Sequence, residues 1–371
     1  MKLTRGLVAV FCLYATASWA EDYTFLPALP VAEVQSMPLL DIAQCGSRYL
    51  AVGERGLALY SEDAGARFQQ AEMPVSQTLT AVYCLPSGKA WAVGHSGSIL
   101  HSEDGGLSWS LQFDGYRANR AWLDYSRQQK TALESAVAAA GQDELEELEY
   151  ALEDAIFAIA DAQEATETGP ADPFLDVWFR DERFGIAVGA YGMMYRTEDG
   201  GESWTLSVAG IDNPDRYHYY SLAADEAGVL FLSGEAGLLY RSQDDGVTWE
   251  QLDVGYDGSL FGLVTTADRA VLAFGLRGNI LRSEDAGRSW EQVVVEKDPQ
   301  LSLYGGTRLG DDSIVLVGAA GAIVSSVNSG RVFQGRITGA RNTLSAVAGD
   351  ELSGTLAIGM GGLERPFGAV Q

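Results

Sequence analysis

Apolar and polar residues alternate in short runs along most of the chain, and one arrangement of these runs recurs. Its clearest copies read Val-Gly-x-x-Gly between apolar runs, such as residues 90–93 and 98–100. Two residues between glycines that flank strand-like runs predict a tight β-hairpin, because glycine readily adopts the positive φ of such turns. The pairs are Gly53/Gly56, Gly94/Gly97, Gly189/Gly192, Gly234/Gly237, Gly275/Gly278, Gly318/Gly321 and Gly359/Gly362.

A second pattern, Ser/Thr-x-Asp-x-Gly-x-x-Trp, follows the glycine pairs. It begins at Ser102, Thr197, Ser242 and Ser283, with weaker copies at Ser61 and Ser326 that end in Phe. Successive starts lie 41 to 45 residues apart, except for one interval of 95 residues. A period in the low forties indicates stacked copies of one supersecondary unit. The residues expected to build these turns are Asp63, Asp104, Trp109, Asp199, Trp204, Asp244, Trp249, Asp285 and Trp290.

Each repeat is long enough for four short strands. In one repeat we expect strands at 220–224, 229–233, 237–241 and 248–252. Four-stranded units repeated around an axis make a β-propeller, so the sequence predicts an all-β fold with seven blades over residues 21–371. The last repeat is too short for four strands. We therefore expect residues 23–29 to supply its outer strand and to close the ring.

The long interval holds an insertion at residues 116–172 between the second and third blades. Its pattern changes to helical spacing, with an apolar stripe at Leu145, Leu148, Leu152, Ala155, Ile156, Ile159 and Ala162. We expect two antiparallel helices, over about 119–140 and from a capping box at Asp143 and Glu146 onward. The connection lies on the same face as the Gly-x-x-Gly turns. The hairpin is a lid or a projecting docking arm, and the sequence does not choose between them.

The first twenty residues have the pattern of an export signal. Lys2 and Arg5 precede an apolar run at 6–17, and small residues lead to a cleavage position after Ala20. The run is short for a membrane anchor. We therefore expect a periplasmic or secreted protein. Without this segment the chain has 23 basic and 51 acidic residues, a net charge of −28, which disfavours nucleic acid as a partner.

Two cysteines, Cys45 and Cys84, remain after cleavage. An oxidising compartment permits a disulfide between them. They occupy matching places in neighbouring repeats, however, and would point the same way around the ring. We therefore expect two buried free thiols, with a disulfide as the alternative.

The Asp pattern resembles the Asp box, or bacterial neuraminidase repeat. Combined with the glycine pattern, as at residues 92–109 and 187–204, it is similar to the photosystem II stability/assembly factor family and its bacterial relatives outside photosynthesis. The resemblance implies a non-enzymatic protein that assists a membrane complex or an efflux-type transporter. The helical insertion departs from that family, so the partner's identity is not carried over.

Catalytic chemistry has little support in the residues. Equivalent Asp boxes cannot all be one active site, and their Asp and Ser side chains suit backbone hydrogen bonds in a turn. The arginine triad of a sialidase is missing, although Arg55 and Arg277 could meet over the axis. No metal site, nucleophile or cofactor motif is evident. A sialidase- or xyloglucanase-like glycoside hydrolase remains the alternative, since its acids can come from any loop.

The favoured hypothesis is a non-catalytic scaffold that binds a membrane protein partner through the face of the glycine turns. Several turn residues are larger or more charged than a turn requires, and a nearby loop adds aromatic and basic groups of the kind enriched at interfaces. The expected binding residues are Glu54, Arg55, His95, Tyr191, Arg216, Tyr217, His218, Tyr219, Glu235 and Arg277.

Overall fold

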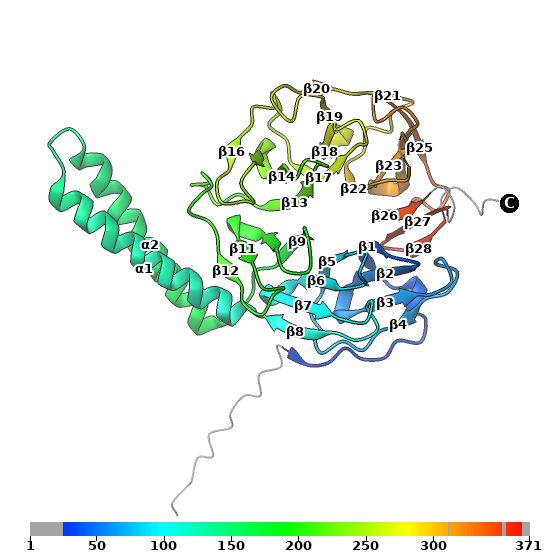
Figure 1. Ribbon diagram of the computed structural model, residues 1–371, viewed down its shortest axis with the longest axis horizontal. Helices are drawn as coiled ribbons and strands as arrows, with labels where there is room; N and C mark the ends of the chain where they lie inside the picture. Colours follow the sequence, from blue (N-terminus) through cyan, green and yellow to red (C-terminus); the bar gives the residue numbers. More distant parts are fainter. Residues whose placement is uncertain (1–24, 311, 351–353, 366–371) are drawn as a thin grey trace, which may run out of the picture.

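The computed structural model describes residues 25–310, 312–350 and 354–365, and its strands form seven sheets that follow one another around a ring (Figure 1). The export signal expected at residues 1–20 lies outside the described residues. The first three sheets contain β1 (Leu39–Cys45), β2 (Arg48–Gly53), β3 (Ala58–Ser61) and β4 (Gln69–Gln70); β5 (Leu79–Cys84), β6 (Ala90–Gly94), β7 (Ser98–Ser102) and β8 (Ser110–Phe113); and β9 (Phe174–Phe179), β10 (Gly185–Gly189), β11 (Met194–Thr197) and β12 (Thr205–Leu206).

The remaining four sheets are less uniform. The fourth has the expected strands to within about two residues, and the sixth gains a parallel strand, β21, at its outer edge. They contain β13 (Tyr219–Ala224), β14 (Leu230–Gly234), β15 (Leu239–Ser242) and β16 (Glu250–Gln251); β17 (Leu260–Thr265), β18 (Val271–Gly275), β19 (Ile280–Ser283) and β20 (Glu291–Gln292); β21 (Val294–Glu296), β22 (Leu303–Arg308), β23 (Ile314–Gly318), β24 (Ala322–Ser326) and β25 (Val332–Ile337); and β26 (Leu344–Asp350), β27 (Gly354–Gly359) and β28 (Gly362–Glu364).

The hydrophobic core lies between neighbouring sheets. The second strand of most sheets is buried along its whole length, as in the run Ala90–Gly94. A strand buried on both faces has a continuous apolar sequence, which explains these runs. The first strands of consecutive sheets contact one another, and β1 also contacts β26. These strands therefore form the inner wall, and the last sheet packs on the first to close the ring.

The N-terminal segment does not complete the last sheet, so that expectation was wrong. Its described part, from Phe25, is not a strand. The Ala28 N–H donates to the Met73 carbonyl and the Gln70 side chain donates to the Leu29 carbonyl, so the segment runs along the first sheet. The last sheet has three strands in the part of the chain that is described. A short 3₁₀ turn at Val34–Ser36 packs on β28 in place of a fourth strand.

The insertion forms two long helices between β8 and β9, α1 (Gly115–Ala139) and α2 (Leu145–Thr168). The Asp114 carboxylate caps α1 by accepting the Arg117 N–H, so the helix begins four residues before the expected start. The expected capping box of α2 does not form, because Glu144 occupies the N-cap position and makes no side-chain cap hydrogen bond. Figure 1 shows both helices outside the ring, so they do not cover its centre. We call this hairpin the arm.

The two ends of the arm meet beside one glycine turn. The Gly97 N–H donates to the Asp172 carbonyl at 2.9 Å. A Cβ added to Gly115 would lie 2.3 Å from the Pro170 side chain, which shows how closely the outgoing and returning segments approach. Neither helix, nor any other in the described chain, is long and apolar enough to cross a membrane.

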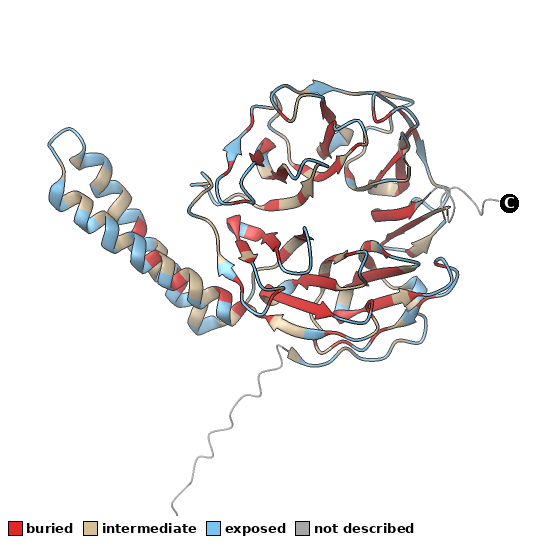
Figure 2. Ribbon diagram, viewed as in Figure 1, coloured by how far each residue is buried: buried red, intermediate tan, exposed pale blue. Residues whose placement is uncertain are grey.

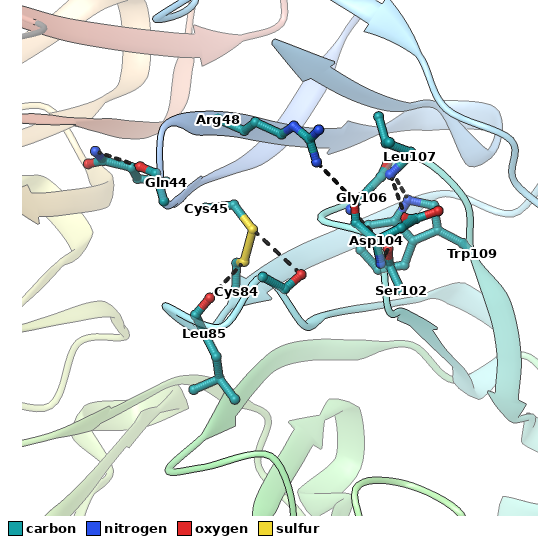
Figure 3. Close-up of a disulfide and its surroundings, with 12 residues drawn as sticks. Gln44, Cys45, Arg48, Cys84, Leu85, Ser102, Asp104, Gly106, Leu107 and Trp109 are labelled. Atoms are coloured by element: carbon teal, nitrogen blue, oxygen red, sulfur yellow. Dashed lines mark hydrogen bonds between the residues drawn. A yellow bond between two sulfur atoms is a disulfide. The ribbon is translucent and has the colours of Figure 1, made fainter. Parts of the chain in front are cut away.

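Cys45 and Cys84 form a disulfide, with Cα atoms 5.3 Å apart (Figure 3). The expectation of two free thiols was therefore wrong. The cysteines end β1 and β5, which are neighbouring strands of the inner wall and contact each other directly. Matching positions are close there because the strands converge towards the axis. The bond joins the first sheet to the second.

Candidate binding face

Six of the glycine turns share one unusual backbone geometry. The second residue between the glycines and the second glycine both have positive φ, as at Arg55 (58°) and Gly56 (69°). The Leu57 N–H closes the turn on the Glu54 carbonyl at 3.1 Å. Two consecutive positive φ values define a type I′ turn, which favours Asn-Gly. The chain instead places Arg55, Ser96, Tyr191, Ala236, Arg277 and Ala320 at the strained position.

The first glycine of each pair is required for a different reason. Gly53 is extended, but a Cβ there would lie 2.3 Å from the Pro38 carbonyl oxygen. The equivalent glycines of most other sheets meet the carbonyl that precedes their own first strand in the same way. The glycines therefore fix the backbone of this face, and the dipeptides between them are free to vary.

Replacing Ala236 by Asn should raise the free energy of unfolding by about 0.5–1 kcal/mol. Asn tolerates the left-handed conformation that Ala236 adopts (φ 53°), whereas alanine is strained there. Urea-induced unfolding of both proteins would measure the change. The same substitution at Ala227, an exposed turn residue whose φ is not positive, provides the comparison and should not stabilise the protein. An equal or lower stability of Ala236→Asn would contradict the argument that the turn is strained.

The structure brings four of the expected binding residues together at the third and fourth sheets. The Tyr191 N–H donates to His218 Nδ1 at 2.9 Å, and their rings meet edge to face with centroids 4.8 Å apart. Arg216 Nε donates to the Tyr191 carbonyl at 3.4 Å. The His218 N–H donates to Glu235 Oε2 at 3.3 Å. We call these four residues the turn cluster.

The base of the arm completes the surroundings of the turn cluster. The Arg216 guanidinium lies over the Trp122 ring of α1, 4.8 Å from its centroid. Beside this pair is a cavity of about 340 Å³ lined by residues of both helices, by Tyr195 of the third sheet and by Asp172 of the segment that joins α2 to β9. Burial raises the pKa of Asp172, while the charges of Arg216 and His218 oppose the shift. A cavity of this size with an aromatic and polar lining is of the kind that binds side chains.

Other expected binding residues do not join this cluster. Glu54, Arg55, His95 and Arg277 lie in turns of the first, second and fifth sheets, and no described contact joins Arg55 to Arg277. Tyr219 was a wrong choice, because its side chain is 1% exposed and packs against Tyr240 in the core. Tyr217 is half-buried on the same core cluster.

A row of aromatic side chains, none of them among the predicted binding residues, lines one wall of the central channel. Tyr220, Phe261 and Tyr304 follow one another on the first strands of three consecutive sheets, with ring centroids 5.2 and 5.5 Å apart. The channel holds a cavity of about 480 Å³. The sequence does contain a pattern that marks these aromatic residues, because all three occupy the second position of the first strand when the repeats are aligned. Each follows a large buried residue and precedes Ser or Gly.

Two carboxylates, Asp41 and Asp176, lie half-buried in the channel wall. Asp41 accepts the N–H groups of Ile42 and, from the next sheet, of Val82, at 2.8 Å each. Asp176 accepts the N–H groups of Val177 and Leu222 in the same way, at 2.7 Å each. Burial raises the pKa of Asp41 to about 6 and that of Asp176 to about 7, and the backbone hydrogen bonds oppose both shifts.

Each of these carboxylates joins two adjacent sheets through both of its oxygens. A catalytic acid or base must present an oxygen to the substrate. Each oxygen of Asp41 and of Asp176 already accepts one backbone amide, which fixes the orientation of both carboxylates. Their geometry is that of a structural link between sheets.

The Asp-box side chains also hydrogen-bond to their own turns. In the fourth sheet Asp244 accepts the Ser242 hydroxyl at 2.8 Å and both the N–H and the hydroxyl of Thr248, at 2.9 and 2.6 Å. These bonds, that from the Thr248 hydroxyl first, lower the pKa of Asp244 to about 2. The Trp249 indole N–H donates to the Gly246 carbonyl. Figure 3 shows the corresponding turn of the second sheet around Asp104 and Trp109. The described residues include no cluster of three or more metal-binding side chains.

Comparison with known proteins finds a family model that matches part of the chain. The family model described as Photosynthesis system II assembly factor YCF48 matches residues 160–297, which span the end of α2, the third to fifth sheets and β21 of the sixth. A solved structure of YCF48 bound to a D1 peptide has a TM-score of 0.60 at 15% identity, covering 91% of this chain and 97% of that chain. The matched stretch of 138 residues (160–297) therefore resembles the YCF48 family, and the structural likeness shows a propeller fold. The resemblance proposed from the Asp and glycine patterns is thereby confirmed.

Other solved structures share the propeller fold. YCF48 from Cyanidioschyzon merolae has a TM-score of 0.60 at 14% identity, covering 90% of this chain and 96% of its own. A GH74 enzyme from Niastella koreensis has the same TM-score at 12% identity, and the match covers 92% of this chain but 53% of the enzyme. No curated protein sequence matches the chain. At these identities the structural likeness shows the fold, and function requires a separate argument.

Proposed function

We propose that this YCF48-like chain is a non-catalytic scaffold that binds a protein, acting as an assembly or stability factor for a membrane protein complex or transporter. The observation that supports this proposal is the turn cluster. It presents aromatic and basic side chains on strained turns where Asn-Gly would suffice. Rigid aromatic and arginine side chains around a pocket are typical of interface hot spots. The solved YCF48 structure with a bound D1 peptide supports a protein ligand on this fold.

The proposal includes architecture and location. The seven sheets are seven blades, and the arm is inserted between the second and third of them.

The chain is exported, with cleavage after Ala20, and works in the periplasm or after secretion. N-terminal sequencing of the protein recovered from the periplasm should begin at Glu21. Recovery from the cytoplasm with Met1 retained would exclude this location.

Removing the phenol of Tyr191 should weaken partner capture by about tenfold, the effect of losing one aromatic hot spot. In Tyr191→Asn the side chain is lost but the left-handed turn is kept, since Asn adopts this conformation readily. The tagged full-length chain would be cross-linked in its host, and the captured membrane proteins would be quantified by mass spectrometry. Ala320→Asn, at the equivalent turn of the sixth sheet, is the matched control and should capture as the wild type does.

Two results would contradict the scaffold. One is the recovery of no membrane protein above an untagged control. The other is equal capture by Tyr191→Asn and the wild-type chain, which would remove the turn cluster from the interface.

A glycoside hydrolase is the second candidate, favoured by the GH74 neighbour. Such an enzyme needs two carboxylates that flank a glycosidic bond with free oxygens. The two channel carboxylates, Asp41 and Asp176, each hold backbone amides of two adjacent sheets, which favours a structural role over acid/base catalysis. A hydrolysis screen on plant and bacterial glycans would decide, and activity lost by one carboxylate substitution on the turn face would replace the scaffold by the enzyme.

A further inference from the structure

The two helices of the arm carry opposite charge. Within α1 there are four basic and two acidic residues, whereas α2 contains eight acidic residues and no basic one. The ion pairs of α1 are internal to it or to its cap: Arg117–Asp114, Arg127–Asp124 and Lys130–Glu134. Across the described chain, no ion pair involves a carboxylate of α2. In the part of the chain that the structure describes, the carboxylates of α2 are therefore not directly paired with basic side chains.

The outer face of α2 also carries exposed apolar side chains. Tyr150 is 63% exposed and Phe157 is 62% exposed, and Ile156 lies beside them at 49%. Tyr150 and Phe157 are seven residues apart, which places them on one line along the helix. The opposite face, including Ala155 and Ala162, is buried against α1. Figure 2 shows this division, with exposed residues along the outside of the arm.

Carboxylates flank this aromatic line closely. Helical spacing places Glu146, Glu153 and Asp154 one turn from Tyr150 or Phe157 on the same face. An isolated helix surface gains nothing from exposed aromatics, and the uncompensated acids repel one another. A bound segment with a line of apolar side chains and basic side chains on either side would cover the aromatic side chains and would also neutralise the carboxylates.

We infer that the outer face of α2 is a second docking surface, and that it binds a cationic amphipathic segment of a partner protein, helical when bound. Charge complementarity selects this occupant, because the acidic face repels anionic lipid and nucleic acid. The contact is a helix laid along a helix, with the aromatic line of α2 against the apolar stripe of the partner. The inference rests on the proposed scaffold function and adds the chemistry of one partner segment.

The test uses the full chain and a synthetic peptide of lysine and leucine residues, patterned as an amphipathic helix of about the length of α2. Binding is followed by fluorescence anisotropy of the labelled peptide at low and high salt. We expect saturable binding that weakens as salt rises, because screening reduces the attraction. A peptide of the same composition in scrambled order should bind at least about tenfold more weakly, since it has no continuous apolar stripe.

Two variants separate charge from apolar contact. Glu146→Gln, Glu153→Gln and Asp154→Asn together should weaken binding by about tenfold and flatten its salt dependence. Tyr150→Ser with Phe157→Ser should weaken it by a similar factor and leave the salt dependence unchanged. The control removes three exposed carboxylates from elsewhere, by Glu33→Gln, Glu202→Gln and Glu291→Gln, and should bind within about twofold of the wild type. Circular dichroism checks that every variant keeps its helices.

Equal binding of patterned and scrambled peptides, or wild-type affinity in either arm variant, would overturn the inference. Partner capture from the host distinguishes this failure from that of the scaffold. If arm variants capture the membrane partner normally while Tyr191→Asn does not, the arm surface is excluded and the scaffold stands. If both lose capture, both are supported.

Discussion

Replacing both Cys45 and Cys84 by alanine should lower the free energy of unfolding by about 4 kcal/mol. The disulfide spans 39 residues, and the chain-entropy relation gives about this value for a loop of that length. The disulfide also joins the inner strands of the first two sheets. The other side-chain contacts between described sheets are non-covalent, so the disulfide is important for holding the ring together. Urea-induced unfolding of the two proteins without reductant would measure the difference.

Reduction provides the control for this prediction. Dithiothreitol should bring the wild-type protein to the stability of the double variant and leave the variant unchanged. A wild-type protein that is equally stable with and without reductant would contradict the prediction, because it would show that the disulfide does not reduce the conformational entropy of the unfolded chain.

The second large effect is an increase in stability as pH is lowered from about 8 to about 5. The pKa values of Asp41 and Asp176 rise from 3.8 to about 6 and about 7 on folding, so the folded chain binds more protons between these limits. Stability therefore falls as pH rises through this window and is regained on acidification. We expect the free energy of unfolding to change by about 1–2 kcal/mol. This is less than the full equivalent of the two pKa shifts, because both side chains are only half-buried and solvent screens part of the effect.

A single substitution isolates this effect. Asp176→Asn cannot ionise and should reduce the pH dependence by more than half, whereas Glu202→Gln on the surface should not alter it. The measurement is the free energy of unfolding in urea at several pH values. The Asp boxes act in the opposite sense but only below about pH 4, since hydrogen bonds lower their pKa values to about 2. A stability that is flat between about pH 5 and pH 8 would contradict the assignment of these carboxylates.

Local patterns predicted the repeated elements well because their causes are local. A Gly-x-x-Gly turn needs positive φ within four residues, and an Asp box satisfies its own backbone, so both are visible in the sequence. The family likeness followed from the same residues. The arm was also foreseen, since helical spacing over twenty residues cannot be mistaken for a strand.

Features that depend on packing between repeats were missed. The sequence does not show how closely inner strands converge, so Cys45 and Cys84 were expected to be apart. The N-terminal segment looked like a strand but found its hydrogen bonds along the first sheet, at Met73 and Gln70. Tyr219 and Tyr220 are adjacent, yet one is in the core and the other faces the channel, because strand register decides which side chain points inward.

The close approach of the two ends of the arm has a consequence for how such proteins diversify. Gly97, Gly115 and Asp172 hold the segments that enter and leave the arm close together. The gap that an insertion must span at this point of the ring is therefore the same whether the insertion is long or short. We therefore expect that the helices can be exchanged for another hairpin, or grafted onto a related propeller, without disturbing the ring of sheets. In that sense the protein is modular, because the arm can change while the ring keeps its shape.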